Sequence, residues 1–182
     1  MTQLGSTVNY STKQNAFTLI EMLVSLIIIT IVLAMALPNV STLLLQNRMD
    51  TLVTEFSQAL YLARSESIKR AVNVTVCSSV NGVSCTTATG WQSGWIVFAD
   101  SNASNDLGVD EERLRVYQNP HNGFTLVGNT YVTSQINYLP TGRISVLGGT
   151  INVCSNDRSQ LGKNIVLIAT GRFRIDTDIA CE

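Results

Sequence analysis

The chain has 182 residues, with 12 Lys and Arg, 13 Asp and Glu and a net charge of −1 at pH 7. This balance excludes a protein that coats nucleic acid by bulk charge, so any such role requires a local basic patch. The length allows one long helix and one globular domain of about a hundred residues.

The chain starts with a polar leader, residues 1–16, followed by an almost wholly apolar stretch, residues 17–38. As a helix this stretch would span roughly 30 Å, the thickness of a bilayer core, so we expect one transmembrane segment. A secretory signal peptide is one alternative, with Ala34-Met35-Ala36 as its cleavage site, but its apolar core would be shorter. An ordinary membrane anchor is another, but it gives no reason for the charge of Glu21.

The junction Ala16-Phe17-Thr18-Leu19-Ile20-Glu21 resembles the prepilin-peptidase site of type IV pilins and type II secretion pseudopilins. The family normally has Gly before the cut, and Ala16 departs from this but is also small. The resemblance implies cleavage after Ala16, methylation of the new amine on Phe17, and residence in the bacterial inner membrane before assembly into a filament. It also implies that Glu21 pairs with such an amine on a neighbouring subunit, because a buried carboxylate and ammonium offset each other's desolvation cost.

Residues 39–70 predict an amphipathic continuation of the helix, ending near Lys69. Apolar residues recur there at three- and four-residue spacing, namely Leu45, Met49, Leu52, Val53, Phe56, Ala59, Leu60 and Ala63. This stripe is too short for a free coiled coil, so we expect it to lie on the protein's own sheet.

Residues 71–182 predict a β-rich periplasmic domain, because short strand-like runs alternate with turn signals. The expected strands are 72–77, 94–98, 113–118, 124–127, 135–139, 144–146, 150–153, 164–169 and 172–176. The segment from Trp91 to Arg115 resembles the GspH/FimT branch of minor pilins. The expected fold class is therefore α+β and type IV pilin-like: a long N-terminal helix packed on an antiparallel β-sandwich-like domain.

Four cysteines follow the apolar stretch, and an even count in an exported domain indicates two disulfides. Sequence alone permits three pairings. We favour Cys77–Cys85, which closes a local loop, and Cys154–Cys181, which fixes the C-terminus. Structural zinc is not expected, since no C-x2-C spacing is present.

No pattern predicts catalysis, a cofactor or a metal site. The acidic loop 100–112 offers oxygen ligands for calcium, but Asn105 stands where an EF-hand has glycine, and a solvated hairpin loop is the preferred interpretation. His121 is the only histidine, and no G-x-S-x-G or P-loop pattern occurs. We therefore expect no enzymatic activity.

The stretch Gly171-Arg172-Phe173-Arg174 is the main candidate site. On a strand, Arg172 and Arg174 share one face about 6–7 Å apart, close to the spacing of phosphates along a nucleic-acid strand. Gly171 permits a tight turn without a side chain that obstructs the approach of a ligand. This stretch resembles the C-terminal GRxR motif of FimT minor pilins, which implies non-specific DNA binding and a role in natural transformation.

Further cations extend this candidate site: Arg143 in the similar Thr141-Gly142-Arg143, with Arg158 and Lys163 as weaker candidates. The alternative is an exposed strand whose arginines pair with Asp176 or Asp178. In that case the chain is a structural tip or initiation subunit of a pilus, or a pseudopilin of type II secretion, without DNA binding.

Overall fold

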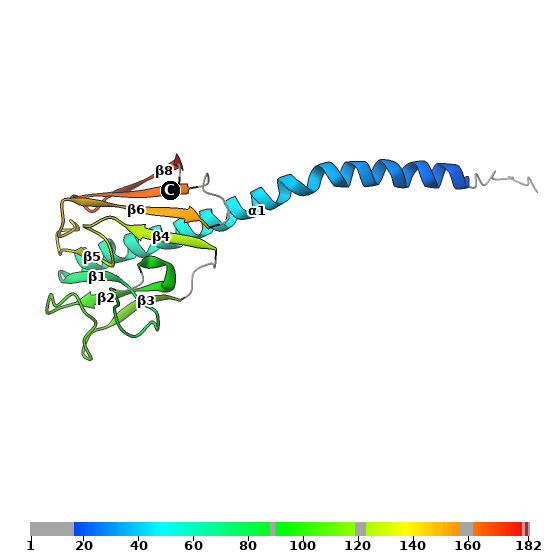
Figure 1. Cartoon of the computed structure of the whole chain (residues 1–182). Helices are drawn as coiled ribbons and strands as arrows, with labels where there is room; N and C mark the ends of the chain where they lie inside the picture. Colours follow the sequence, from blue (N-terminus) through cyan, green and yellow to red (C-terminus); the bar gives the residue numbers. More distant parts are fainter. Residues whose placement is uncertain (1–16, 88–89, 119–122, 157–161, 180, 182) are drawn as a thin grey trace, which may run out of the picture. The chain divides into compact units, whose positions relative to one another are not determined.

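The computed structural model describes residues 17–87, 90–118, 123–156, 162–179 and 181, without the side chains of residues 35–41 and 178 (Figure 1). The leader, Ala16, His121 and Arg158 lie outside the described residues. The elements in chain order are α1 (Leu19–Arg70), β1 (Asn73–Ser78), the 3-10 helix η1 (Trp91–Ser93), β2 (Gly94–Asp100), β3 (Arg113–Gln118), β4 (Phe124–Gly128), β5 (Gln135–Tyr138), β6 (Gly148–Ser155), β7 (Gly162–Ile168) and β8 (Phe173–Ile179).

The chain divides after Thr42 into two compact units, and the first holds the N-terminal part of α1. Thr18 caps this helix: its Oγ1 accepts a hydrogen bond from the backbone N–H of Glu21 at 3.3 Å. The large apolar side chains described in this unit are exposed, and Phe17 retains 79% of its surface. Within the described residues, no helix contains an apolar run of the length that a membrane crossing requires.

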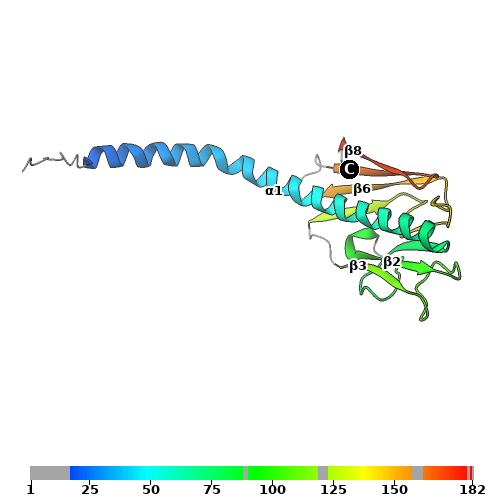
Figure 2. The same cartoon turned by 180° about the vertical axis from the view of Figure 1, so that it is seen from behind.

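The second unit, residues 43–182, contains two four-stranded antiparallel sheets and the C-terminal part of α1 (Figure 1). The strand orders are β3-β2-β1-β5 and β4-β6-β7-β8. Figure 2 shows this part of α1 running along both sheets. The expected α+β class with an antiparallel, sandwich-like domain is confirmed.

One expected strand is wrong: residues 144–146 form no strand, and only Ile144 makes an isolated bridge, to Tyr138. The backbone groups of this segment bond in two directions. Ser145 N–H donates to Asn137 O of β5 at 2.9 Å, while Ile144 N–H donates to Ala169 O after β7 at 3.2 Å. A segment that connects the two sheets in this way cannot continue one ladder.

The core forms where α1 meets the sheets, and the sequence-derived stripe is its helical side. Seven of the eight stripe residues are buried, and the eighth, Leu45, is partly buried beside them. Phe56 is at the centre, with its ring centroid 5.1 Å from that of Trp91 and 4.9 Å from that of Trp95. Such buried aromatic contacts contribute strongly to stability, so they fix how the second half of α1 lies on the domain.

A smaller apolar cluster of Cys77, Ile96 and Phe98 lies on the other side of the first sheet. Cys77 forms a disulfide with Cys85 there, and the second disulfide joins Cys154 of β6 to Cys181. These are the two pairs favoured from the sequence. No cysteine remains free.

The acidic stretch 100–112 begins with a carboxylate that is bonded within the protein. The buried carboxylate of Asp100 accepts hydrogen bonds from Ser104 N–H at 3.0 Å, Asn105 N–H at 3.1 Å and the Thr75 hydroxyl at 3.0 Å. Among the described residues, no three His, Cys, Asp or Glu side chains gather in a way that could hold a metal ion.

Candidate functional site

Two glycine turns meet at one end of the second unit. Gly171 has φ +76° and is buried, and a Cβ atom built on it would lie 2.0 Å from the carbonyl oxygen of Gly142. Gly142 has φ +74°, and a Cβ atom there would lie 2.6 Å from Cδ1 of Ile68 on α1. Both positions therefore require glycine. The space beside Gly171 is filled by the protein's own backbone. This glycine therefore allows the close packing of the two turns and, contrary to the expectation from the sequence, does not leave room for the approach of a ligand.

A buried tyrosine lies beneath these turns. The Tyr138 hydroxyl donates a hydrogen bond to the Gly171 carbonyl oxygen at 3.4 Å. Burial raises the pKa of Tyr138, and the charge of Arg64 acts in the opposite direction. The phenol therefore stays neutral at physiological pH and remains a hydrogen-bond donor.

The two turns bring Arg143 and Arg172 into one region, since each arginine directly follows its glycine. Both side chains are exposed. Among the described residues, neither takes part in an ion pair. The two adjoining turns therefore present two cations for which the described residues provide no carboxylate partner.

Arg174 differs from Arg172 because it already has a partner. β8 begins at Phe173, so Arg172 precedes the strand and Arg174 lies within it. The Nε of Arg174 donates to both carboxylate oxygens of Asp176, at 3.0 and 3.3 Å. Phe173, between the arginines, is half-buried and packs against the core. This ion pair agrees with the alternative interpretation of the sequence, in which the arginines of an exposed strand pair with Asp176 or Asp178.

Lys163 is also paired, with Asp50 of α1. This contact joins residues 113 positions apart in sequence, and it neutralises one of the two weaker candidate cations. The other weak candidate, Arg158, lies outside the described residues.

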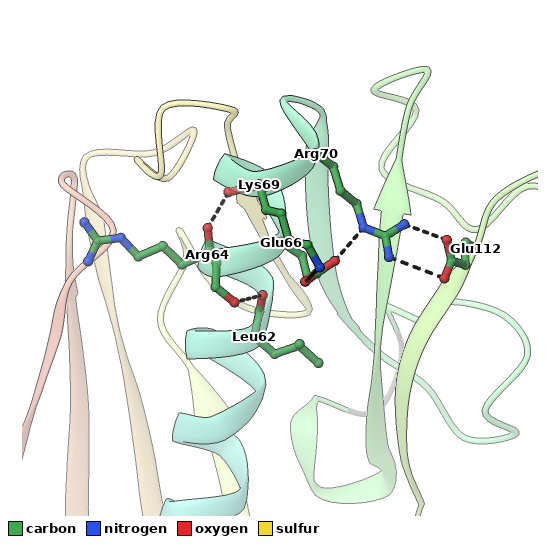
Figure 3. A network of polar contacts seen from close by, with 8 residues as sticks. Leu62, Arg64, Glu66, Lys69, Arg70 and Glu112 are labelled. Carbon is green, nitrogen blue, oxygen red and sulfur yellow. Dashed lines mark hydrogen bonds and ion pairs between the residues drawn. The ribbon is translucent and has the colours of Figure 1, made fainter.

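Arg64 is a cation that the sequence interpretation did not include in the site. It is half-buried on α1, and its Nε lies 3.4 Å from the position of a Cβ atom built on Gly142. Figure 3 shows it extending from α1 away from the side that carries Glu66 and Arg70. The sequence offered one indication of this position: Arg64 directly follows the buried Ala63, at the boundary of the apolar stripe.

The C-terminal end of α1 carries a saturated charge network (Figure 3). Arg70 lies between Glu66 and Glu112, with N–O distances of 2.5 Å to each, and Lys69 contacts Glu66 at 3.2 Å. Hydrogen bonds from Arg70 lower the pKa of both carboxyl groups. These cations are occupied, unlike Arg64, Arg143 and Arg172, for which no ion pair is found among the described residues.

At the N-terminal end, Glu21 is exposed in the first turn of α1. No ion pair of this carboxylate is found among the described residues. The proposed cleavage site between Ala16 and Phe17 directly precedes it, and Ala16 is outside the described range.

Two family profiles match the chain. The profile described as type II transport protein GspH matches residues 52–171, and the prokaryotic N-terminal methylation motif matches residues 11–37. A search of curated protein sequences found no match.

Solved structures show where this fold occurs. The type IV minor pilin FimU of Pseudomonas aeruginosa is 14% identical in two crystal forms, with TM-scores of 0.57 and 0.51. Each alignment covers 75% of this chain, with 97% and 99% of the FimU chains. The minor pseudopilin EpsH of the Vibrio cholerae type 2 secretion system is 11% identical, with a TM-score of 0.47 over 68% of this chain and 92% of EpsH. At such identity the FimU likeness shows the fold alone.

The GspH profile spans more than half of the chain, the methylation motif lies at its N-terminus, and the second unit has the fold of a pilin domain. The chain therefore belongs to the family described as type II transport protein GspH, and it carries the N-terminal methylation motif.

Proposed function

We propose that the protein is a minor pilin of a type IV pilus that binds DNA without sequence preference and supports DNA uptake in natural transformation. The observation that carries this proposal is the presence of Arg143 and Arg172 on two adjoining turns without a carboxylate partner among the described residues. Arg174 follows on β8, and the Gly171-Arg172-Phe173-Arg174 stretch resembles the GRxR motif of FimT.

Guanidinium groups suit this role because each can make bidentate, charge-assisted contacts to a phosphate. Contacts of this kind position a protein on nucleic acid without reading its bases. The small net negative charge of the chain points to weak affinity, about micromolar at moderate salt.

The N-terminal segment supports a filament role. In this proposal prepilin peptidase cuts after Ala16, the amine of Phe17 is methylated, and residues 17–38 hold the precursor in the inner membrane with the β-rich domain in the periplasm. Assembly then stacks α1 against the helices of other pilins, and Glu21 pairs with the terminal amine of a neighbour. The exposed apolar side chains of the first unit would be covered in this way.

A second candidate function is a structural one, as a FimU-like tip or initiation minor pilin or a GspH-like pseudopilin without DNA binding. One observation favours it: the match to the GspH profile ends at residue 171, directly before the two arginines. Arg174 is also paired with Asp176 in the absence of any ligand. Members of this family are filament subunits and not enzymes, so neither candidate function includes catalysis.

A binding experiment separates the two functions. The purified full chain in detergent is titrated against labelled duplex DNA of several sequences at low and moderate salt. We expect similar micromolar binding to all sequences, and weaker binding to all of them alike when Arg172 and Arg174 are both replaced by Gln. The salt slope should fall by about one unit for each lost phosphate contact. Equal binding by the double variant, with an unchanged melting temperature, would leave the structural function.

A further inference from the structure

A groove of about 600 Å³ adjoins the paired glycine turns. Its lining comes from the segment that connects the two sheets, from the end of β7 at Ala169 and from Tyr131. Arg143 also lines it, so a cation that has no ion pair with any described residue contributes to a concave surface. The volume lies within the range of sites for small molecules and cofactors.

Two side chains in this groove expose large apolar surfaces. Leu147 retains 87% of its surface and Tyr131 retains 60%. Single exposed apolar residues are common, but two that line the same concave site beside a cation form a more specific arrangement. An exposed aromatic ring next to a guanidinium is the combination by which proteins hold unpaired nucleotides: the ring packs on the base and the cation on the phosphate.

The groove is also connected to the proposed phosphate-binding arginines. Ile144 lies in its lining, and its N–H donates to Ala169 O two residues before Gly171. A strand whose phosphates contact Arg172 therefore passes close to the groove mouth at Arg143. In a duplex, neighbouring base pairs cover both faces of every base, so a base from a duplex must first be unstacked and unpaired, a cost that an unpaired strand avoids.

We propose that this groove accepts one unpaired base of a DNA strand, with the Tyr131 ring packed on the base and Arg143 on the adjoining phosphate. This inference rests on the proposed DNA binding and adds to it a preference for single-stranded over duplex DNA. The arginines alone give no such preference, because phosphates are present in both forms. One stacked base changes affinity by roughly ten- to a hundredfold, which sets the size of the preference.

The test compares Tyr131→Leu with Tyr61→Leu in the full chain in detergent. Tyr61 is a control for loss of an exposed ring beside the arginine motif: it is similarly exposed, at 63%, and its ring centroid lies 4.8 Å from that of Phe173, but it does not line the groove. The probes are a labelled oligothymidylate and a labelled duplex of the same length, and binding is followed by fluorescence polarisation. Melting temperatures show whether each variant is folded.

We expect Tyr131→Leu to weaken oligothymidylate binding about ten- to a hundredfold while duplex binding stays unchanged. Tyr131→Phe should bind both probes as the wild type does, since it keeps the ring. A probe with one photoreactive 5-iodouracil should crosslink to Tyr131, as shown by peptide mapping.

Three results would overturn the groove proposal. They are equal losses for both probes, a larger loss from Tyr61→Leu, and an unchanged affinity of Tyr131→Leu for oligothymidylate. Each of these leaves the proposed function intact provided that the wild type binds duplex DNA and that the Arg172→Gln, Arg174→Gln double variant binds it more weakly. Absence of binding to both probes by the wild type would instead overturn the proposed function together with the groove.

Discussion

Gly142 and Gly171 pack backbone against backbone, so closely that a Cβ atom on Gly171 would lie 2.0 Å from the Gly142 carbonyl oxygen. This contact holds together the turns that present Arg143 and Arg172. It joins residues from different sheets, because Gly142 follows β5 and Gly171 precedes β8. The geometry of the candidate site therefore depends on two residues that have no side chains.

Replacing Gly171 by Ala should destabilise the protein more than replacing Gly123 by Ala. Both glycines have positive φ, which costs a residue with a Cβ atom about 1–2 kcal/mol. Only Gly171 also has a backbone atom in the way, whereas nothing lies within 4 Å of a Cβ atom on Gly123. We expect Gly171→Ala to cost about 1–3 kcal/mol more, as for other overpacked sites. Urea unfolding of both variants measures the difference, and equal costs would show that the turns can separate.

Asp176→Asn should strengthen DNA binding, because it releases Arg174 from its ion pair. The substitution also removes a negative charge two residues from Arg174, so the affinity for duplex DNA should rise a few-fold and the salt slope should increase. Exposed ion pairs contribute about 0–1 kcal/mol, so folding should change little. Asp50→Asn removes the same charge and frees Lys163, one of the weaker candidates, so a gain of equal size there would show that the effect is not specific to Arg174. An unchanged affinity in Asp176→Asn would mean that Arg174 does not contact DNA.

Arg64→Gln should weaken DNA binding, although Arg64 stands on a different element from the predicted motif. Its Nε lies close to the Gly142 turn, so its charge adds to the field of Arg143 and Arg172. We expect a loss of a few-fold and a reduction of the salt slope by up to about one unit. Arg48→Gln removes the same charge from α1 sixteen residues earlier, roughly 24 Å away along the helix, and should have a smaller effect. Equal losses would indicate an effect of net charge alone.

Much of the fold could be predicted because it follows from periodicity. The apolar spacing from Met49 to Ala63 predicted the buried face of α1. Alternation with turn residues predicted every strand that the structure describes, together with one, 144–146, that does not form. The prediction of a strand at 144–146 was wrong because the backbone of this segment bonds to both sheets, and no local sequence pattern encodes such a connection.

The candidate site was predictable only where its residues are close in sequence. The Arg172 and Arg174 stretch and the possible pairing with Asp176 were visible in one strand. Arg64 was not, because its approach to Gly142 depends on how α1 packs against a turn far along the chain. The pairing of Lys163 with Asp50 was hidden for the same reason.

The ion pair of Arg70 and Glu112 should make stability depend on pH in a defined window. Hydrogen bonds from Arg70 lower the pKa of Glu112 below its ordinary value of 4.5. A lowered pKa in the folded state means that the stabilisation is present above pH 4.5 and is lost as the pH falls through the folded-state value. The melting temperature of wild type should therefore exceed that of Glu112→Gln slightly near neutral pH, and the two should converge in acid. In an Arg70→Gln background the Glu112→Gln change should have no effect at any pH, and a persistent effect there would assign it to other contacts.

Glu21→Gln should leave the protein in the membrane but reduce its incorporation into filaments. The carboxylate stands in the first turn of α1 among exposed apolar side chains, without an ion pair among the described residues. In the proposed filament, neighbouring helices cover these side chains, so the charge needs a partner, and the methylated amine of Phe17 on the next subunit would supply one. Gln has nearly the same shape but cannot neutralise an ammonium, so stacking would leave that ammonium unpaired.

Ser25→Ala is the matched control: it lies one turn further on the same face, and its hydroxyl bonds to the Glu21 backbone oxygen at 2.7 Å. Cells carrying each variant are sheared, and the protein is quantified in the membrane and filament fractions. Mass spectrometry of the membrane form shows whether the N-terminus was cut and methylated. We expect normal membrane levels for both variants, with loss from filaments only in Glu21→Gln. Filament levels equal to those of wild type would show that the Glu21 carboxylate has no part in assembly.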